Sequence, residues 1–497
     1  WAKYPKKRPV DCDKTDEERI EWMNTMWDNI KNHNQLFVID HLFNESKYEE
    51  GRNILRYYKY KPTDCHNEKP DKIIDQHYLN HDEIDIQWNG EDKCLVFRSD
   101  TGTGKTTAMK HYLKNHEGHS RFISIVSRIS LGKEQAKVFK EHNLECEYWE
   151  TIQKEIDEEN ESMGPGCWYG DYKSWCDYEG ENIVITIDSL MKLTFCNFDG
   201  YTIFLDEFNS LIEYFVTCHN GNLIKNRIGI QQQLNRILRD CELIVCSDAD
   251  ISDTSLLYLK QQKIDYTFID NKYKHNSGIK ASEIKSFKKF KKQLLKEEKF
   301  LMCCDSKTMA FALAADDPSI KVFTSEYSGE INLDDHEKVI FSPKIVYGLD
   351  SLMERPVYGY FCGHTITPKA MNQQINRCRK ITHLYYHFEA RGSMILPYKY
   401  HDYQEIVDEM KHENKYGCQL FGLTSPKLND QYLELAAQFH YNIDCYNTNK
   451  KAHFLNILEH KGFNVSYNFI DEGDYFKEKK IKDAAIQKSM TMRYNDM

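Results

Sequence analysis

The residues with the clearest chemical potential form a glycine-rich run at positions 99–107. The run reads Ser-Asp-Thr-Gly-Thr-Gly-Lys-Thr-Thr, follows the apolar stretch 94–98, and precedes a helical pattern over 108–116. A glycine-rich turn between a strand and a helix, closed by Lys-Thr, is typical of a loop that wraps phosphate groups. The usual first glycine is replaced by Ser99, so the match is centred on the Gly-Lys-Thr portion.

Each residue type in this run has a defined task. Gly102 and Gly104 allow the tight turn that directs backbone N–H groups at a phosphate, and the Lys105 ammonium neutralises its oxygens. The Thr106 hydroxyl is a ligand for Mg²⁺. The run therefore supplies these candidates for binding a nucleotide: Gly102, Thr103, Gly104, Lys105, Thr106 and Thr107.

A pair of acids follows a second apolar stretch. Asp206 and Glu207 come directly after residues 201–205. Hydrolysis of a nucleotide needs one acid to hold Mg²⁺ and a second to orient water, so we assign Asp206 to the metal and Glu207 to the water. Acids after a strand also serve as helix caps, and this structural interpretation stays open at the sequence level.

A third cluster lies much later, at positions 373–380. It contains Gln373, Arg377 and Arg379 near the end of a second series of strands. Arginine forks suit the charge that develops on a transferred phosphoryl group. We therefore predict that this cluster acts on the same nucleotide, although the sequence leaves open which arginine does so, and a solvated basic helix is the alternative.

Short apolar runs alternate with helical patterns in two series, a rhythm that predicts parallel α/β sheets. The expected strands of the first series are 94–98, 121–126, 182–187, 201–205 and 243–246, and those of the second are 300–304, 320–324, 338–342, 357–362 and 383–387. Helical patterns occur at 16–32 and 47–60 before them. The run from Phe287 to Lys296 predicts an amphipathic packing helix, with a contribution of its lysines to nucleic-acid binding as the alternative.

The 497 residues are enough for about three domains. We expect an N-terminal accessory region (1–80), a first lobe (81–265), a second lobe (266–390) and a mainly helical C-terminal accessory domain (391–497), with a linker near 256–280. The chain begins at Trp1 without Met, from which we expect a piece cut from a longer polypeptide.

The composition excludes several classes of protein. A net charge of −11 argues against a protein that coats nucleic acid through bulk charge, although a local basic groove remains compatible with it. No long apolar run or leader predicts a membrane span or a secretory signal, so we expect an intracellular protein. The scattered cysteines favour reduced thiols in the core; Cys167 and Cys176 are the nearest approach to a zinc pattern.

The order of these blocks over about 90–390 resembles that of superfamily 2 helicases, and more narrowly of the herpesvirus origin-binding helicases and their relatives in large DNA viruses. The run 99–107 resembles motif I, and Asp206-Glu207-Phe208-Asn209 resembles motif II. Ser247-Asp248-Ala249-Asp250 is similar to the Asp-Ala-Asp of the narrower family. The other similar blocks are 125–128 (Ia), 186–190, 303–307 (IV), 342–350 (V) and 373–379 (VI).

The resemblance implies an α/β fold of two tandem RecA-like parallel-sheet lobes with N-terminal and mainly helical C-terminal extensions. It implies ATP as the nucleotide and Mg²⁺ held by Thr106 and Asp206, and it adds Gly348 and Asp350 to the nucleotide-binding candidates. The chain departs from the family at Asn376, where a glycine is usual.

The resemblance also implies a track for nucleic acid along the ends of strands. Small hydroxyls and a few cations suffice for a grip on phosphates that ignores sequence. The implied contacts are Ser127, Arg128 and Ser189 in the first lobe and Ser306, Lys307 and Ser342 in the second. Each of these serines is by itself more typical of a cap or a turn.

The leading hypothesis is an ATP-dependent DNA helicase or translocase of a viral replication system, moving 3′ to 5′ on single-stranded DNA or a forked duplex. Its partners would be a primase, fused or separate, a polymerase or a single-strand-binding protein, with an oligomer as a further option. It would work in the cytoplasm (viral factory) or nucleus of a host cell. The alternatives are another motor, such as a packaging ATPase, or a noncatalytic scaffold that uses nucleotide as a switch.

Overall fold

The protein is represented by a computed structural model. The residues it describes are 68–79, 93–115, 121–162, 173–178, 182–218, 221–327, 331–343, 349–363, 366–389, 403–420, 430–448, 450–466 and 475–495. The helical patterns at 16–32 and 47–60, together with Cys167 and Gly348, lie outside these residues.

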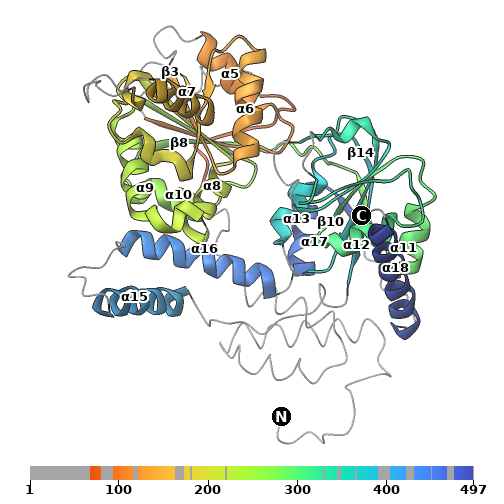
Figure 1. Ribbon diagram of the computed structural model, residues 1–497. Coiled ribbons are helices and arrows are strands. Elements are labelled where there is room, and N and C mark those ends of the chain that lie inside the picture. The colour runs from red at the N-terminus through yellow and green to blue at the C-terminus, as the bar shows by residue number, and fades with distance from the viewer. Residues whose placement is uncertain are drawn as a thin grey trace, which may run out of the picture.

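The first lobe is built on a sheet that is parallel throughout, with eight described strands in the order β1-β8-β2-β7-β6-β3-β5-β4. Helices lie on both faces of this sheet (Figure 1). The strands are β1 (Lys72–Ile74), β2 (Cys94–Arg98), β3 (Arg121–Val126), β4 (Glu147–Tyr148), β5 (Ile183–Thr186), β6 (Tyr201–Asp206), β7 (Leu243–Asp248) and β8 (Tyr266–Asn271).

The central strands of this sheet are buried along their whole length. Every residue of β6 and β7 is buried. A parallel strand covered by helices on both faces reads as a continuous apolar run, which explains why the sequence pattern located these strands within two residues. The covering helices are α5 (Lys105–Asn115), α6 (Ile129–Glu141), α7 (Trp149–Ser162), α8 (Phe208–Thr217), α9 (Gly221–Asp240) and α10 (Asp253–Gln261).

The second lobe repeats the architecture, with seven described strands in the order β11-β12-β10-β13-β14-β9-β15, again all parallel. Two tandem parallel α/β lobes are the predicted fold class, which is confirmed. The strands are β9 (Lys280–Glu283), β10 (Phe300–Cys304), β11 (Lys321–Phe323), β12 (Lys338–Phe341), β13 (Arg355–Phe361), β14 (Ile381–Phe388) and β15 (Asn464–Ser466). Its helices include α11 (Phe287–Leu294), α12 (Lys307–Ala314) and α13 (Pro368–Ile375).

The linker expected near 256–280 is shorter than predicted. Residues 253–271 form α10 and β8, and β8 pairs with both β1 and β2 in the first sheet. The crossing from β8 to β9 takes only residues 272–279. The prediction failed here because β8 carries Thr, Asp and Asn, and its place in the sheet depends on two neighbours that are distant in sequence.

The helices of the C-terminal region pack on both lobes (Figure 1). α15 (Tyr403–Leu420) packs on α16 (Asp430–Thr448), and α16 packs on α8 and α10 of the first lobe. α17 (Lys450–His460) packs on α13, β15 extends the second sheet beside β9, and α18 (Tyr475–Asn495) lies on α11 and α12. The segment thus connects the two lobes.

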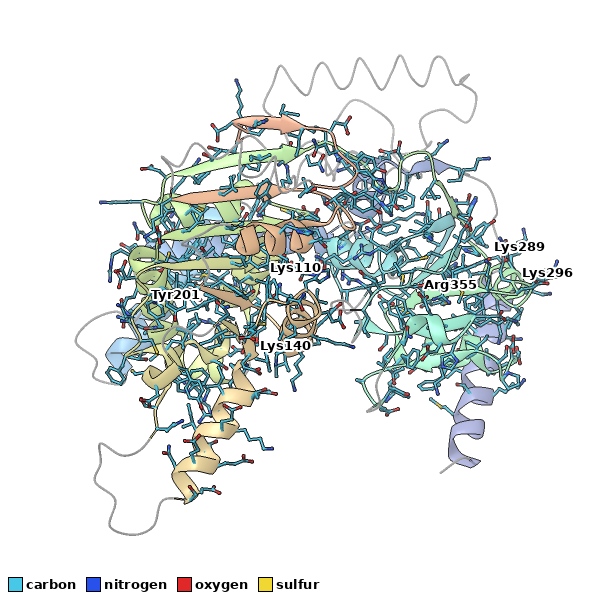
Figure 2. All side chains as sticks on the ribbon, turned by 90° about the horizontal axis from the view of Figure 1, so that it is seen from above. Lys110, Lys140, Tyr201, Lys289, Lys296 and Arg355 are labelled. Atoms are coloured by element: carbon cyan, nitrogen blue, oxygen red, sulfur yellow. The ribbon has the colours of Figure 1, made fainter. Side chains whose placement is uncertain are left out.

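Within the second lobe, α11 is the amphipathic helix that the sequence predicted. Phe287, Phe290 and Leu294 are buried, while Lys289 and Lys296 lie on the surface of the lobe (Figure 2). Arg355 lies in the interior instead, fully buried, where its guanidinium donates to the carbonyl oxygens of Leu333 and His336. This network fixes the edge of the sheet at which β13 begins.

Among the helices that the structure describes, none has the length and apolar character that crossing a bilayer requires. Most of the described cysteines are buried free thiols, in agreement with the expected reduced core.

Candidate nucleotide site

The candidate site lies where three neighbouring strands of the first sheet end. β2, β7 and β6 are adjacent and parallel, so their carboxyl ends share one edge. The 99–107 loop follows β2, Asp206 ends β6 with Glu207 directly after it, and Ser247 and Asp248 end β7, which lies between β2 and β6. This shared edge brings together residues that are far apart in the sequence. Ligands of open parallel α/β sheets bind at the carboxyl ends of the strands.

The loop has the conformation that its glycines predicted. Gly102 has φ of 79° and Gly104 has φ of 77°, a region that other residues rarely adopt. Thr103 is buried, and its hydroxyl lies 2.7 Å from both the Asp100 carbonyl oxygen and the Ser99 hydroxyl. Ser99 thus stiffens the loop where a glycine is usual.

Lys105 begins α5 and is folded back onto the loop. Its ammonium donates to the carbonyl oxygens of Ser99 (2.8 Å) and Asp100 (3.0 Å). Burial lowers the pKa of Lys105, while the nearby carboxylates of Asp206 and Asp248 raise it. The cation is positioned where it can exchange these carbonyl oxygens for phosphate oxygens. Thr107, on the same turn, is exposed.

Asp206 is oriented by three neighbours. Its Oδ1 accepts a hydrogen bond from the Ser247 hydroxyl (2.8 Å), and its Oδ2 accepts one from the Gln135 amide (2.6 Å). The Thr106 hydroxyl lies 3.4 Å from the same Oδ2. One carboxylate beside one hydroxyl, at the mouth of a phosphate loop, fits the oxygen donors that Mg²⁺ takes from a protein when phosphates and water supply the rest.

Glu207 has an unusual backbone for a residue with a side chain. Its φ and ψ of 52° and 48° are left-handed, and its N–H donates to Asp206 Oδ1. Such conformations cost free energy and concentrate at functional sites. Burial raises the pKa of Glu207 to about 8, with Arg377 opposing the shift and Asp206 adding to it. Its Oε2 is buried and accepts no hydrogen bond from the described residues.

Asp248, at the end of β7, is hydrogen-bonded to the segments that follow β2 and β6. Its side chain accepts from the backbone N–H of Asn209 (2.9 Å) at the start of α8, and its carbonyl oxygen accepts from the Ser99 N–H (3.0 Å). Burial raises its pKa. The acid that resembles the first Asp of the Asp-Ala-Asp block therefore holds the loop and the acid pair in register.

The second lobe brings its arginines to the same place. Arg377 and Arg379 both donate to Asp350, at 3.2 Å and 2.8 Å. The Arg379 Nη1 lies 3.6 Å from the position that a Cβ on Gly102 would occupy, so this guanidinium touches the phosphate loop. Arg377 is buried within the electrostatic field of Glu207. Of the remaining predicted residue, Gln373, the backbone carbonyl oxygen accepts from Arg377 Nε at 3.3 Å.

Gln135 and two further features of the site were missed from the sequence. The first is Glu134 on α6, half-buried between Asp206 of its own lobe and the arginines of the other. Burial raises the pKa of Glu134 to about 7, Asp350 adds to the shift, and Arg377 and Arg379 oppose it. An isolated acid in a helix carries no motif, so only the approach of the second lobe identifies it.

The second is an aromatic cluster beside the loop. The Tyr78 ring lies 3.7 Å from the Cβ position of Gly104, and the Leu79 N–H donates to the Thr103 carbonyl oxygen. His77 stacks between Tyr78 and Tyr273, with ring centroids 4.1 Å and 4.8 Å away. Tyr78 is 65% exposed, which leaves an aromatic face open next to the phosphate site. Its segment has no pattern that sequence reasoning could have used.

The predicted nucleic-acid contacts of the first lobe continue along the same sheet edge. Ser127 and Arg128 follow β3, and Ser189 follows β5, the next two strands after β6. Arg128 is exposed, whereas Ser127 and Ser189 are buried. Ser189 accepts a hydrogen bond from Thr186 at 3.1 Å.

Those of the second lobe follow β10 and β12 and have partners within the protein. Ser306 caps α12, where its side chain accepts from the Met309 N–H at 3.4 Å. Lys307 forms an ion pair with Glu326, and Ser342 is buried. They lie at the carboxyl ends of their strands, whereas Arg377 and Arg379 lie at the amino ends of β13 and β14.

No protein-family model matches this chain, and no curated protein matches it in sequence. Solved structures similar to it include S. cerevisiae Dbp5 bound to RNA and ADP BeF3 (12% identity, 80% of this chain and 90% of that chain, TM-score 0.41). Another is the helicase Lhr of Mycobacterium smegmatis bound to ssDNA and AMP-PNP (11% identity, 60% of this chain and 44% of that chain, TM-score 0.39). A third is the Escherichia coli DEAH/RHA helicase HrpB (13% identity, 62% of this chain and 42% of that chain, TM-score 0.41).

Proposed function

We propose that the protein is a nucleic-acid-stimulated ATPase of the superfamily 2 helicase type that moves along single-stranded nucleic acid. The observation that carries the proposal is the composite site: the Arg379 guanidinium of one lobe lies against Gly102 in the phosphate loop of the other. A nucleotide held between two lobes links its hydrolysis to their relative movement, whereas a nucleotide held within one lobe does not.

In this proposal the loop N–H groups and Lys105 bind the phosphates, and the aromatic face of Tyr78 is available to the base. Thr106 and Asp206 would hold Mg²⁺, which supplies charge neutralisation at the phosphates. The ionised Glu207 orients the attacking water, and the arginines stabilise the charge that develops on the transferred group. Loss of the terminal phosphate then removes what the arginines bind and allows the lobes to separate.

The track in this proposal runs along the strand ends that carry Ser127, Arg128 and Ser189 and continues onto the second lobe. These residues adjoin the strand of Asp206 on the same edge, so a bound strand lies next to the hydrolytic acids. The Asp-Ala-Asp resemblance supports DNA as the track, 3′ to 5′ movement and a place in viral DNA replication, in the host cytoplasm or nucleus.

The test compares ATP turnover of the wild-type chain with Lys105→Ala, each with no nucleic acid, with single-stranded DNA and with single-stranded RNA. We expect turnover that single-stranded DNA stimulates and that Lys105→Ala abolishes. Strand separation from a 3′ tail but not a 5′ tail would support the proposed direction. Turnover indifferent to nucleic acid, or nucleotide binding without any turnover, would refute the motor and favour a nucleotide-switched scaffold.

A further inference from the structure

A carboxylate stands inside the phosphate loop, where an anion is unfavourable. Asp100 is the second residue of the loop and is 5% exposed. Its Oδ1 accepts from the Thr101 N–H (3.0 Å), and its Oδ2 is buried with no hydrogen-bond partner among the described residues. A buried negative charge this close to a polyphosphate site would repel the ligand unless a cation neutralises it.

The cation comes from the far end of the chain. The Lys461 ammonium lies 3.2 Å from Asp100 Oδ1, 2.9 Å from Asp250 Oδ1 and 3.2 Å from the Ala249 carbonyl oxygen. An ammonium has three N–H donors, so these three acceptors satisfy it. Burial alone would lower the pKa of Lys461, but the two carboxylates raise it above its ordinary value. The lysine is therefore charged while it is 8% exposed.

Lys461 belongs to the turn between α17 and β15. This turn packs against residues 272–279, which connect β8 to β9. Gly462 has φ of 92°, and a Cβ there would lie 3.1 Å from both the Lys274 Cβ and the Ser277 Cα. The Gly278 N–H donates to the Gly462 carbonyl oxygen (3.0 Å). A side chain at Gly462 would be strained and crowded, and glycine lets the turn pack closely against residues 272–279.

Two elements of the site thus meet at one ammonium. Asp100 belongs to the loop after β2, and its carbonyl oxygen accepts from Lys105. Asp250 follows β7, and its N–H donates to Asp248, which also orients α8. Lys274, exposed beside the same turn, adds a second positive charge in the field of Asp100. Without Lys461, two carboxylates would face each other beside the phosphates.

We propose that Lys461 is a positioning residue of the nucleotide site, which cancels the charge of Asp100 inside the phosphate loop and fixes this loop to the strand end that carries Asp250. The C-terminal segment thereby completes a site whose binding groups all lie elsewhere. This inference rests on the proposed nucleotide-binding function.

The test titrates the full chain with a fluorescent ATP analogue in the presence of Mg²⁺. The variants are Lys461→Met, Asp100→Asn and the two combined. Lys450→Met is the matched control, because Lys450 is a buried lysine of α17 that donates to the Ile366 carbonyl oxygen in the second lobe. We expect Lys461→Met to weaken binding of the nucleotide by about tenfold. Interaction free energies between residues in direct contact include the value that corresponds to a tenfold change in Kd. Lys450→Met should change it by less than about twofold.

The double variant separates charge from structure. Removal of the Asp100 carboxylate should recover a large part of the affinity that Lys461→Met loses, because the charge that needed a partner is gone while the bridge to Asp250 stays broken. A double variant that binds as weakly as Lys461→Met, or a Lys461→Met that behaves like Lys450→Met, would overturn the inference.

Hydrogen exchange without nucleotide gives a readout that is independent of the proposed function. Lys461→Met should increase exchange over residues 99–104 and 247–250 and leave α12 unchanged. If the wild-type chain bound no nucleotide, the proposed function would fail. The exchange result would still test whether Lys461 fixes the loop to the strand end that carries Asp250. If Lys461→Met did not fold, Asp100→Asn alone would decide: we expect unimpaired nucleotide affinity, and a loss of fivefold or more would overturn the inference.

Discussion

The Arg379 guanidinium lies 3.6 Å from the place where a Cβ on Gly102 would stand, although the two residues belong to different lobes. Asp350 holds the guanidinium there through Nε, and His275 hydrogen-bonds to the Arg379 carbonyl oxygen at 2.7 Å. The φ of 79° at Gly102 allows this approach, because the residue has no Cβ. The phosphate loop and an arginine of the second lobe therefore form one surface.

Arg379→Ala should lower ATP turnover by about a thousandfold while the affinity for the nucleotide falls much less, because the guanidinium acts mainly on charge that develops during transfer. Arg377→Ala should also lower turnover, since its charge faces Glu207. Single-turnover hydrolysis beside nucleotide titration measures both quantities. Lys380→Ala removes an exposed neighbouring cation and is the control. Equal losses in Lys380→Ala and Arg379→Ala would contradict the assignment.

Turnover should rise with pH through a step near 8. The pKa of Glu207 is raised to about 8, and only its ionised form orients water, so kcat/KM should increase about tenfold per pH unit below 8 and level off above it. Glu207→Gln should abolish the step and lower turnover by at least about a hundredfold. The pH profile of kcat/KM is the measurement.

Glu134 provides the control for that profile, because its pKa of about 7 falls in the same range. Glu134→Gln should keep a step near pH 8. A profile that loses the step in Glu134→Gln and keeps it in Glu207→Gln would reverse the two assignments.

Gln135→Ala should lower turnover by roughly tenfold or more, the usual effect of losing a group that orients a metal ligand. Its amide donates to Asp206 at 2.6 Å and accepts from Ser124 at 2.6 Å, which ties the acid to α6. Steady-state turnover over a range of Mg²⁺ concentrations should show a higher Mg²⁺ requirement. Gln233→Ala is the matched control, because Gln233 is a buried glutamine of α9 that donates to the Leu193 carbonyl oxygen. An unchanged Mg²⁺ requirement would count against this role.

Arg128→Ala should weaken binding of single-stranded DNA and reduce the salt dependence of binding by about one counterion, since Arg128 is exposed at the end of β3. Fluorescence anisotropy at several salt concentrations measures both. Arg239→Ala, at the opposite end of the sheet beside Asp240, is the control. The first-lobe track would be refuted by a salt slope that Arg239→Ala changes and Arg128→Ala does not.

Local sequence determined the central strands and the loop because both depend on nearest neighbours. Apolar runs such as those of β6 and β7 are buried on both faces, so their pattern is complete without knowledge of the partner strands. Gly102 and Gly104 adopt positive φ for a reason that each residue carries by itself. Ser306 caps α12. Its local pattern is typical both of a helix cap and of a nucleic-acid contact, so the sequence alone left both roles open.

Tertiary structure decided everything that requires two distant segments to meet. The strand β8 has a mixed pattern and became part of the first sheet through β1 and β2. Lys461 and Glu134 carry no motif, because a single charged residue acquires a role only from the charges placed opposite it. The sequence thus determined the phosphate loop and the candidate acids, and only packing of the C-terminal turn and the second lobe decided which charges surround them.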